Sequence, residues 1–234
     1  MKKLIIILVL SITGNIISAQ NLNLESLLIG GSTPAVHYPD LYYEIQIARL
    51  NKNTTLELFY DATVQEYINS FLSTRKDQFL TFKKRSDLFF PLFEKYLIEY
   101  NLPGELKYLA VVESGLETTA RSPSGAVGLW QFKEKTGRHY GLVINDIQDD
   151  RIDPEASTIA ACKYFNVLYE IFGSWELALI AYNAGPTFLS ETISEKQLDP
   201  DYHSLSSYLP IPARRYLPAM VAIIYLFENH EMHF

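Results

Sequence analysis

Apolar residues recur with helical spacing through most of this chain, and this spacing constrains the fold more than any other feature. From about residue 62 onward they fall three or four positions apart, as at Val64, Tyr67, Ile68, Phe71 and Leu72. That period places them on one face of an α-helix. No segment alternates apolar and polar residues convincingly in the way a half-buried strand does. The sequence therefore predicts an all-α protein, and a hydrophobic content of 48% is enough for a substantial core.

Capping signals mark the ends of several expected helices. Pro103 suits the first turn of one helix and Gly115 the position just after its end. Ser174 suits an N-cap, and Gly185 ends the short helix that follows. The helices expected from these signals and from the periodicity cover residues 103–114, 154–172, 175–184 and 216–228.

The first residues have the composition of an export signal. Lys2 and Lys3 precede an apolar run from Leu4 to Leu10, and small residues end at Ala19, which together are typical of a cleavable signal peptide. The apolar run is shorter than the ~20 residues that span a bilayer. The predicted parts of the chain are a signal peptide (1–19), an N-terminal extension that is helical from about 62 (20–100) and a catalytic domain (101–234).

The chain is acidic, with a formal charge of −7 that becomes −9 when cleavage removes the two lysines. An acidic protein is a poor match for nucleic acid, whose phosphates require clustered Lys and Arg. Cys162 is the one cysteine, so no intramolecular disulfide can form and no cysteine follows the signal to carry a lipid. We expect Cys162 to be a core residue, and the mature protein to be a periplasmic monomer, peripheral to the outer membrane.

Glu113 is the candidate for acid chemistry. It follows the apolar run from Tyr108 to Val112 at the C-terminal end of an expected helix. Apolar surroundings and the negative end of the helix dipole both disfavour an ionised carboxylate, and both therefore raise its pKa. A raised pKa suits a general acid near neutral pH. The alternative is a helix-end glutamate that is simply turned to solvent.

Two further segments combine aromatic and amide side chains. After Glu113 comes a loop rich in small residues, residues 121–128, and Trp130 and Gln131 follow it. Such a loop can approach a ligand closely. We expect Trp130 to be a core residue, whereas Gln131 suits a ligand contact as well as a structural hydrogen bond. Tyr182 and Asn183 repeat the pattern at the end of an apolar helix, where a core residue and a helix cap are the alternatives.

Taken together, the motifs "ESG" (113–115), "GLWQF" (128–132) and "AYNAG" (181–185) resemble a known family. In this order and at these separations they are similar to the lytic transglycosylases of glycoside hydrolase family 23, in the lysozyme-like superfamily. The likeness covers roughly residues 60–230 and includes "LPGELKYLAVVESG" and "DDRIDPEAST". The sequence departs from the family pattern at Lys133-Glu134, because lytic transglycosylases of this kind often have Met-Pro after the Gln-Phe of the "GLWQF" motif.

The resemblance implies a lysozyme-like fold and a reaction on peptidoglycan glycan strands that needs no cofactor and no metal. Glu113 would be the single catalytic acid and base, cleaving the bond between N-acetylmuramic acid and N-acetylglucosamine to form a 1,6-anhydro sugar. The positions that match substrate-groove residues of the family are Ser114, Gln131, Tyr182, Asn183 and Tyr216.

Two alternatives remain on the same fold. A hydrolytic muramidase of goose type usually needs a second carboxylate. Glu117 is the nearest in sequence, while Asp149, Asp150 and Asp153 lie in a polar stretch before a helix, where capping is the expected role. The other alternative is a non-catalytic glycan-binding protein of the envelope.

Overall fold

The computed structural model describes residues 38–234, which pack as one compact unit. The predicted signal peptide, residues 1–19, lies outside the described residues. Within residues 38–234 the chain forms helices and no β-strand, only isolated β-bridges such as the pair of Arg121 with Val127. The prediction of an all-α fold is confirmed.

The helices of this part of the chain, in order, are α1 (Asp40–Leu50), α2 (Ala62–Leu72), α3 (Lys76–Glu99), α4 (Lys107–Ser114), α5 (Glu134–His139), α6 (Pro154–Phe172), α7 (Trp175–Ala184), α8 (Pro186–Lys196), α9 (Tyr202–Ser206), α10 (Ile211–Arg214), α11 (Tyr216–Glu228) and α12 (His230–His233). Short 3₁₀ turns at Gly104–Leu106 (η2) and Asp150–Ile152 (η3) precede α4 and α6. None of the helices within residues 38–234 is both long and apolar enough to cross a lipid bilayer.

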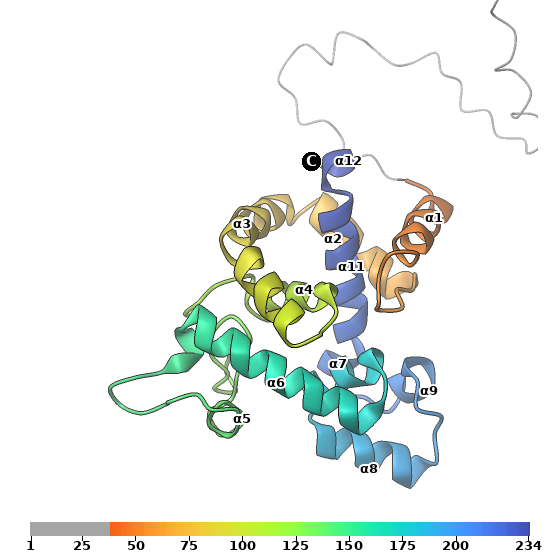
Figure 1. Ribbon diagram of the computed structural model, residues 1–234. Coiled ribbons are helices and arrows are strands. Elements are labelled where there is room, and N and C mark those ends of the chain that lie inside the picture. Colours follow the sequence, from red (N-terminus) through yellow and green to blue (C-terminus); the bar gives the residue numbers. More distant parts are fainter. Residues whose placement is uncertain (1–37) are drawn as a thin grey trace, which may run out of the picture. The chain divides into compact units, whose positions relative to one another are not determined.

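Helix α11 lies at the centre of the structure (Figure 1). Eleven of its thirteen residues are buried, as expected for a helix that is apolar on all sides. It packs against α2, α4 and α7, while α6 packs against α3 and α7. This arrangement brings the start of α11 to the end of α4, although the two are about a hundred residues apart in sequence.

Most expected helices agree with the structure, and two differences have physical reasons. The helix expected from residue 103 begins later, because Pro103 is extended and a 3₁₀ turn precedes α4. Helix α1 lies in a region for which no helix was expected. It buries only Tyr43 and Ile47, while Leu41 and Ile45 on its other side are exposed, so its apolar pattern is blurred.

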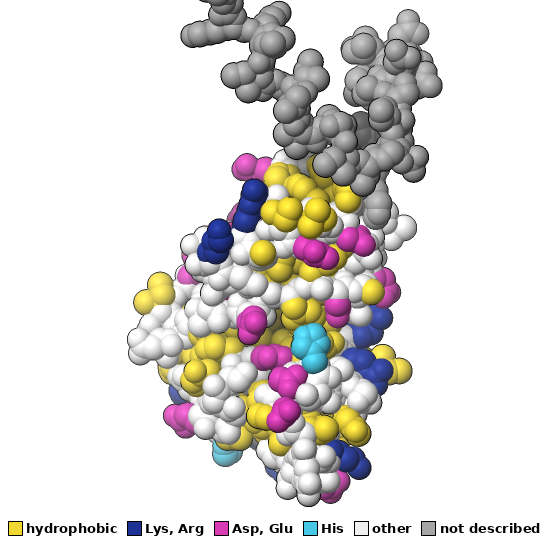
Figure 2. Space-filling view, turned by 90° about the vertical axis from the view of Figure 1, so that its right-hand side faces the viewer, with side chains coloured by type: hydrophobic (Ala, Val, Ile, Leu, Met, Phe, Trp, Pro, Cys, Tyr) yellow, Lys and Arg dark blue, Asp and Glu magenta, His cyan; other side chains and the backbone are white. Residues whose placement is uncertain are grey.

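The surface is acidic in keeping with the composition. On the face drawn in Figure 2, carboxylate side chains are spread among hydrophobic ones over the middle, and most of the basic side chains lie toward the edges. Lys and Arg number 20 against 27 Asp and Glu. Against this acidic background, a local cluster of positive side chains indicates a site for an anionic ligand.

Candidate active site

Glu113 lies in the last turn of α4, which ends at Gly115 in the left-handed conformation with φ of 58°. A Cβ at this position would come within 2.5 Å of the Phe82 ring on α3, so glycine allows both the turn and the close packing of the two helices. Helix α4 therefore ends at Ser114, and this places the carboxylate of Glu113 at a helix end inside the molecule.

The carboxylate of Glu113 has one hydrogen-bond donor, the phenol of Tyr216 at the start of α11. Protein surrounds Glu113 densely, and its remaining surface faces cavities rather than bulk solvent. Burial raises the pKa of Glu113 to about 7, against an ordinary value of 4.5, while the hydrogen bond from Tyr216 acts in the opposite direction. At neutral pH a large fraction of this carboxyl group therefore carries a proton.

Two cavities meet at Glu113. The first has a volume of about 790 Å³ and extends toward α2 and α3. The second, of about 410 Å³, extends toward α7 and its C-terminal end. Glu113, Ser122 and Gln131 line both. The carboxylate thus lies at the junction, where an extended ligand that runs from one cavity into the other would pass it.

Ser114 and Gln131 join α4 to the loop that follows. Ser114 Oγ lies 2.9 Å from the carbonyl oxygens of both Ala110 and Leu129. Gln131, at φ of 50°, donates from Nε2 to the carbonyl oxygens of Ala120 and Gly128, at 3.2 and 2.9 Å. The amide nitrogen of Gln131 is thereby used within the protein, which leaves its carbonyl oxygen as the group available to a ligand in the cavities.

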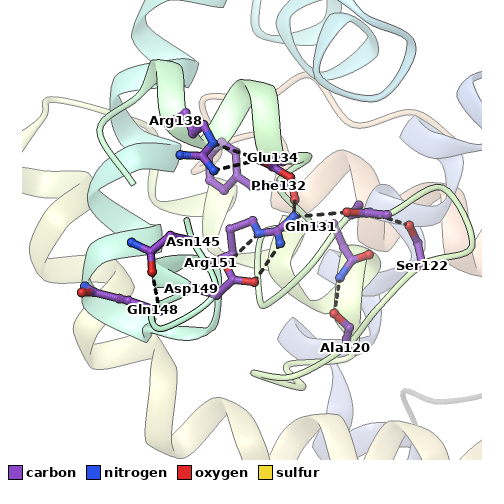
Figure 3. A network of polar contacts seen from close by, with 12 residues as sticks. Ala120, Ser122, Gln131, Phe132, Glu134, Arg138, Asn145, Gln148, Asp149 and Arg151 are labelled. Carbon is purple, nitrogen blue, oxygen red and sulfur yellow. Dashed lines mark hydrogen bonds and ion pairs between the residues drawn. The ribbon is translucent and has the colours of Figure 1, made fainter. Parts of the chain in front are cut away.

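The buried Arg151 holds the loop of residues 120–132 in place through hydrogen bonds (Figure 3). Its guanidinium binds both carboxylate oxygens of Asp149, at 2.8 and 2.7 Å, and donates to the carbonyl oxygens of Gly125 and Phe132. The backbone carbonyl oxygen of Arg151 packs so closely against Gly128 that a Cβ there would lie 1.8 Å away. This contact fixes the loop that carries Gln131.

Tyr182 and Asn183, near the end of α7, line the second cavity. The phenol of Tyr182 donates to the carbonyl oxygen of Trp130 at 2.7 Å, and its ring stacks on Phe165. Trp130 is fully buried, as expected, and its indole donates to Thr158 at 3.0 Å. The aromatic core therefore holds the chain segment that leads into Gln131.

The structure thus brings the six predicted site residues together. Glu113 and Gln131 line both cavities, Ser114 the first, and Tyr182 and Asn183 the second, while Tyr216 reaches the site through its hydrogen bond to Glu113. The carboxylates considered as a second catalytic group are engaged elsewhere. Glu117 lines the first cavity but pairs with Arg85.

The three aspartates before α6 have structural partners. Asp149 pairs with Arg151, Asp150 accepts a hydrogen bond from the backbone of Val143, and Asp153 caps α6. None of them lines either cavity. The expected capping role is confirmed for Asp149, which caps the 3₁₀ turn η3, and for Asp153.

Sequence reasoning missed several residues of the site. Tyr164 lines the second cavity and its ring lies 5.2 Å from that of Tyr182. An aromatic residue beside the apolar stripe of the 154–172 helix was the available signal. Arg85 and Arg151 gave no such signal, because a charged residue in sequence is expected at the surface by default.

Comparison with known proteins agrees with this geometry. Residues 91–204, which include five of the six predicted site residues, match the family model described as the transglycosylase SLT domain. The membrane-bound lytic murein transglycosylase D of Escherichia coli (strain K12) is 35% identical over 137 residues, covering 57% of this chain and 30% of that protein. The peptidoglycan transglycosylase gp16 of Escherichia phage T7 is 35% identical over 111 residues, covering 47% of this chain and 8% of that protein.

The fold is also similar to that of a solved structure, the 70 kDa soluble lytic transglycosylase SLT70 from Escherichia coli. The TM-score is 0.51 at 23% sequence identity, over 61% of this chain and 24% of the other. The expectation of a lysozyme-like transglycosylase fold is confirmed. The chain spans 30% of the length of the first of these relatives and 8% of the second. Residues 91–204 thus match the transglycosylase SLT domain, and this stretch of the chain is similar to lytic transglycosylases.

Proposed function

We propose that this protein is a peptidoglycan lytic transglycosylase. It cleaves the β-1,4 bond between N-acetylmuramic acid and N-acetylglucosamine and leaves a 1,6-anhydro-N-acetylmuramic acid end. The observation that carries the proposal is the position of Glu113, enclosed by protein at the junction of two cavities, with a pKa raised to about 7. A carboxyl group in this state can give up a proton and take one back near neutral pH.

The proposed reaction uses Glu113 twice. Protonated Glu113 first gives its proton to the glycosidic oxygen as the bond from C1 of the muramic residue to that oxygen breaks. The C6 hydroxyl of the same residue then attacks C1, and the carboxylate of Glu113 takes the hydroxyl proton. The new C1–O6 bond closes the anhydro ring, Glu113 returns to its starting state and no water is consumed. An intramolecular nucleophile makes this attack fast without a second catalytic carboxylate.

The other predicted residues act on the position of the substrate and the state of the acid. We assign Ser114, Gln131, Tyr182 and Asn183 to the glycan groove, where the carbonyl oxygen of Gln131 can accept from an N-acetyl or hydroxyl group. Tyr216 orients the carboxyl group of Glu113 through their hydrogen bond.

A hydrolytic muramidase is less well supported. Of the residues that the structure describes, the carboxylates that line the two cavities are Glu113 and Glu117, and Glu117 is held by the guanidinium of Arg85. A carboxylate in an ion pair is a weak base, which disfavours activation of a water by Glu117. A non-catalytic glycan-binding role is also less well supported, because binding alone does not require a buried carboxyl group with a raised pKa.

The cellular setting is part of the proposal. Substrate strands of peptidoglycan lie in the periplasm, so we propose that residues 1–19 direct export and that the enzyme acts there as a monomer. The division into an N-terminal extension (20–100) and a catalytic domain (101–234) remains a prediction.

Purified sacculi provide the test. The Glu113→Gln variant keeps the shape of the side chain but holds no exchangeable acid proton, and we expect it to lose at least about a hundredfold in the rate of lysis. Glu99→Gln is the matched control, because Glu99 is an exposed residue at the end of α3 and lines neither cavity. Lysis by Glu113→Gln at the rate of Glu99→Gln, with both variants folded, would overturn the proposal.

A further inference from the structure

The first cavity has one wall that lies outside the stretch matched by the family model. Helix α2, the turn after it and the first part of α3 contribute Tyr67, Arg75, Gln78 and Arg85 to its lining. All of these precede residue 91, where the match to the SLT domain begins. The opposite wall comes from the loop after α4 and includes Arg121. We call this cavity the first arm of the groove. Part of this arm is therefore built by residues that the family model does not describe.

This arm is lined by three arginines in a protein whose formal charge is −7. Arg85 is neutralised internally, since it pairs with Glu117 and donates to the carbonyl oxygen of Gly115 at 3.0 Å. In residues 38–234, neither Arg75 nor Arg121 lies within 4.0 Å of a carboxylate. The arm therefore carries excess positive charge.

Arg75 is oriented without being neutralised. Its guanidinium lies over the ring of Phe71, 4.0 Å from the ring centroid, and Nε donates to Oε1 of Gln78 at 2.7 Å. Both contacts restrict the side chain, and neither partner carries a charge. An arginine held in this way loses less conformational entropy when it binds an anion.

Arg121 is likewise not neutralised. Among the described carboxylates, Asp149 is one whose pKa Arg121 helps to lower, but both oxygens of Asp149 are already bound by Arg151. Guanidinium groups bind carboxylates through paired, charge-assisted hydrogen bonds. Arg75 and Arg121 therefore complement an anionic ligand, and a carboxylate matches the geometry of their guanidinium groups.

A carboxylate is present on the substrate of the proposed function. Muramic acid carries a lactyl ether, to which the stem peptide is joined, and stem peptides end in carboxylates and bear further ones on acidic residues. We propose that Arg75 and Arg121 bind the carboxylates of the stem peptide, so that this arm of the groove selects glycan strands that still carry peptides. The proposal rests on the proposed function for its substrate. The other source of the same chemistry is the lactyl carboxylate that is exposed once the peptide is removed.

Binding and turnover of two matched substrates separate these sources. One is a set of soluble glycan strands with intact stem peptides, and the other is the same strands after an amidase has removed the peptides. We expect Arg75→Gln and Arg121→Gln each to raise KM for peptide-bearing strands about 10- to 100-fold, the range of a lost charge-assisted hydrogen bond. For peptide-free strands KM should change by less than about twofold, and Arg75→Lys should recover much of the loss.

Arg49→Gln is the matched control, because Arg49 is exposed on α1 and lines neither cavity. A loss confined to peptide-free strands would overturn the proposal in favour of the lactyl carboxylate, and an equal loss on both substrates would overturn it in favour of a general structural effect. No loss on either would overturn it as well.

Binding measured in a Glu113→Gln background keeps this test independent of catalysis. The dissociation constant of that variant for peptide-bearing strands should rise by the same factor when Arg75 or Arg121 is replaced. If the wild-type protein forms no anhydro product, the proposed function fails, yet the binding measurement still supports or overturns the carboxylate site.

Discussion

The phenol of Tyr216 donates a hydrogen bond to Oε1 of Glu113, across 103 residues of sequence. The bond joins the first residue of α11 to the last turn of α4. Burial raises the pKa of Glu113, and this hydrogen bond opposes the rise. Tyr216 itself is 5% exposed and its pKa is raised far above the usual range, so it keeps its proton and remains a donor at neutral pH.

Replacing Tyr216 by Phe should move the pH profile of the enzyme. A general acid is active while protonated, so kcat/KM should fall on the alkaline side as Glu113 loses its proton, with a midpoint near the pKa of about 7. Without the hydrogen bond the ionised carboxylate is less stable, and the pKa of Glu113 rises. The alkaline limb of Tyr216→Phe should therefore shift to higher pH. Tyr225 is a second buried tyrosine of α11 and lines neither cavity, so Tyr225→Phe should leave the alkaline limb where it is in wild type. If the alkaline limbs of Tyr216→Phe and Tyr225→Phe have the same midpoint, Tyr216 does not lower the pKa of Glu113.

The raised pKa of Glu113 also predicts how stability depends on pH. The native protein holds this proton up to about pH 7, whereas the unfolded chain releases it near 4.5. Between these values the unfolded state is favoured by ionisation, so the free energy of unfolding contributed by Glu113 falls as pH rises, by about 3 kcal/mol in all. The Glu113→Gln variant has no carboxyl group at this position, so its free energy of unfolding does not include this fall with rising pH.

Denaturant unfolding at several pH values measures the effect. Relative to wild type, Glu113→Gln should gain stability between pH 4.5 and pH 8, and the difference should stay constant below pH 4.5. The Glu99→Gln control should show no such trend. A difference between Glu113→Gln and wild type that does not change with pH would contradict the raised pKa.

Gly128 and Gly125 offer a matched pair for testing how the loop is held. Both have positive φ, 86° and 81°, but a Cβ at Gly128 would lie 1.8 Å from the carbonyl oxygen of Arg151, while a Cβ at Gly125 meets nothing within 4 Å. Gly125→Ala should cost about 1 kcal/mol of backbone strain. Gly128→Ala should cost at least about 2 kcal/mol more, because the loop has to move away from Arg151. Equal losses in urea unfolding would mean that this contact does not fasten the loop.

Replacing Glu117 distinguishes a cavity-lining carboxylate from a catalytic one. Its ion pair with Arg85 is half exposed, and such pairs contribute about 1 kcal/mol or less to stability. We expect Glu117→Gln to retain lytic activity within about tenfold of wild type, since the loss of a catalytic carboxylate typically lowers the rate by a hundredfold or more. A loss comparable to that of Glu113→Gln would favour a two-carboxylate hydrolase.

Local signals in the sequence account for much of the fold. The helix expected over residues 154–172 is α6, and the one expected over 216–228 is α11. Each has a strong start signal or a long apolar run, so the local preference and the packed structure agree. Helix α1 has neither, and its two buried residues reveal it only once the core is assembled.

The candidate site was predicted in part. The residue types and motifs pointed to Glu113 and Gln131, but no local signal shows that Tyr216 reaches Glu113, because that contact joins distant parts of the chain. The burial of Arg151 could not be read from a stretch of charged residues, and it depends on carbonyl oxygens supplied by Gly125 and Phe132. Contacts of this kind are set by the tertiary fold.

The mass of the products released from purified sacculi tests the central claim most directly. If Glu113 serves both steps of an intramolecular ring closure, the muropeptides carry 1,6-anhydro ends and are one water lighter than their hydrolytic counterparts. Products with reducing ends, which a borohydride reduction would label, would contradict the proposed reaction.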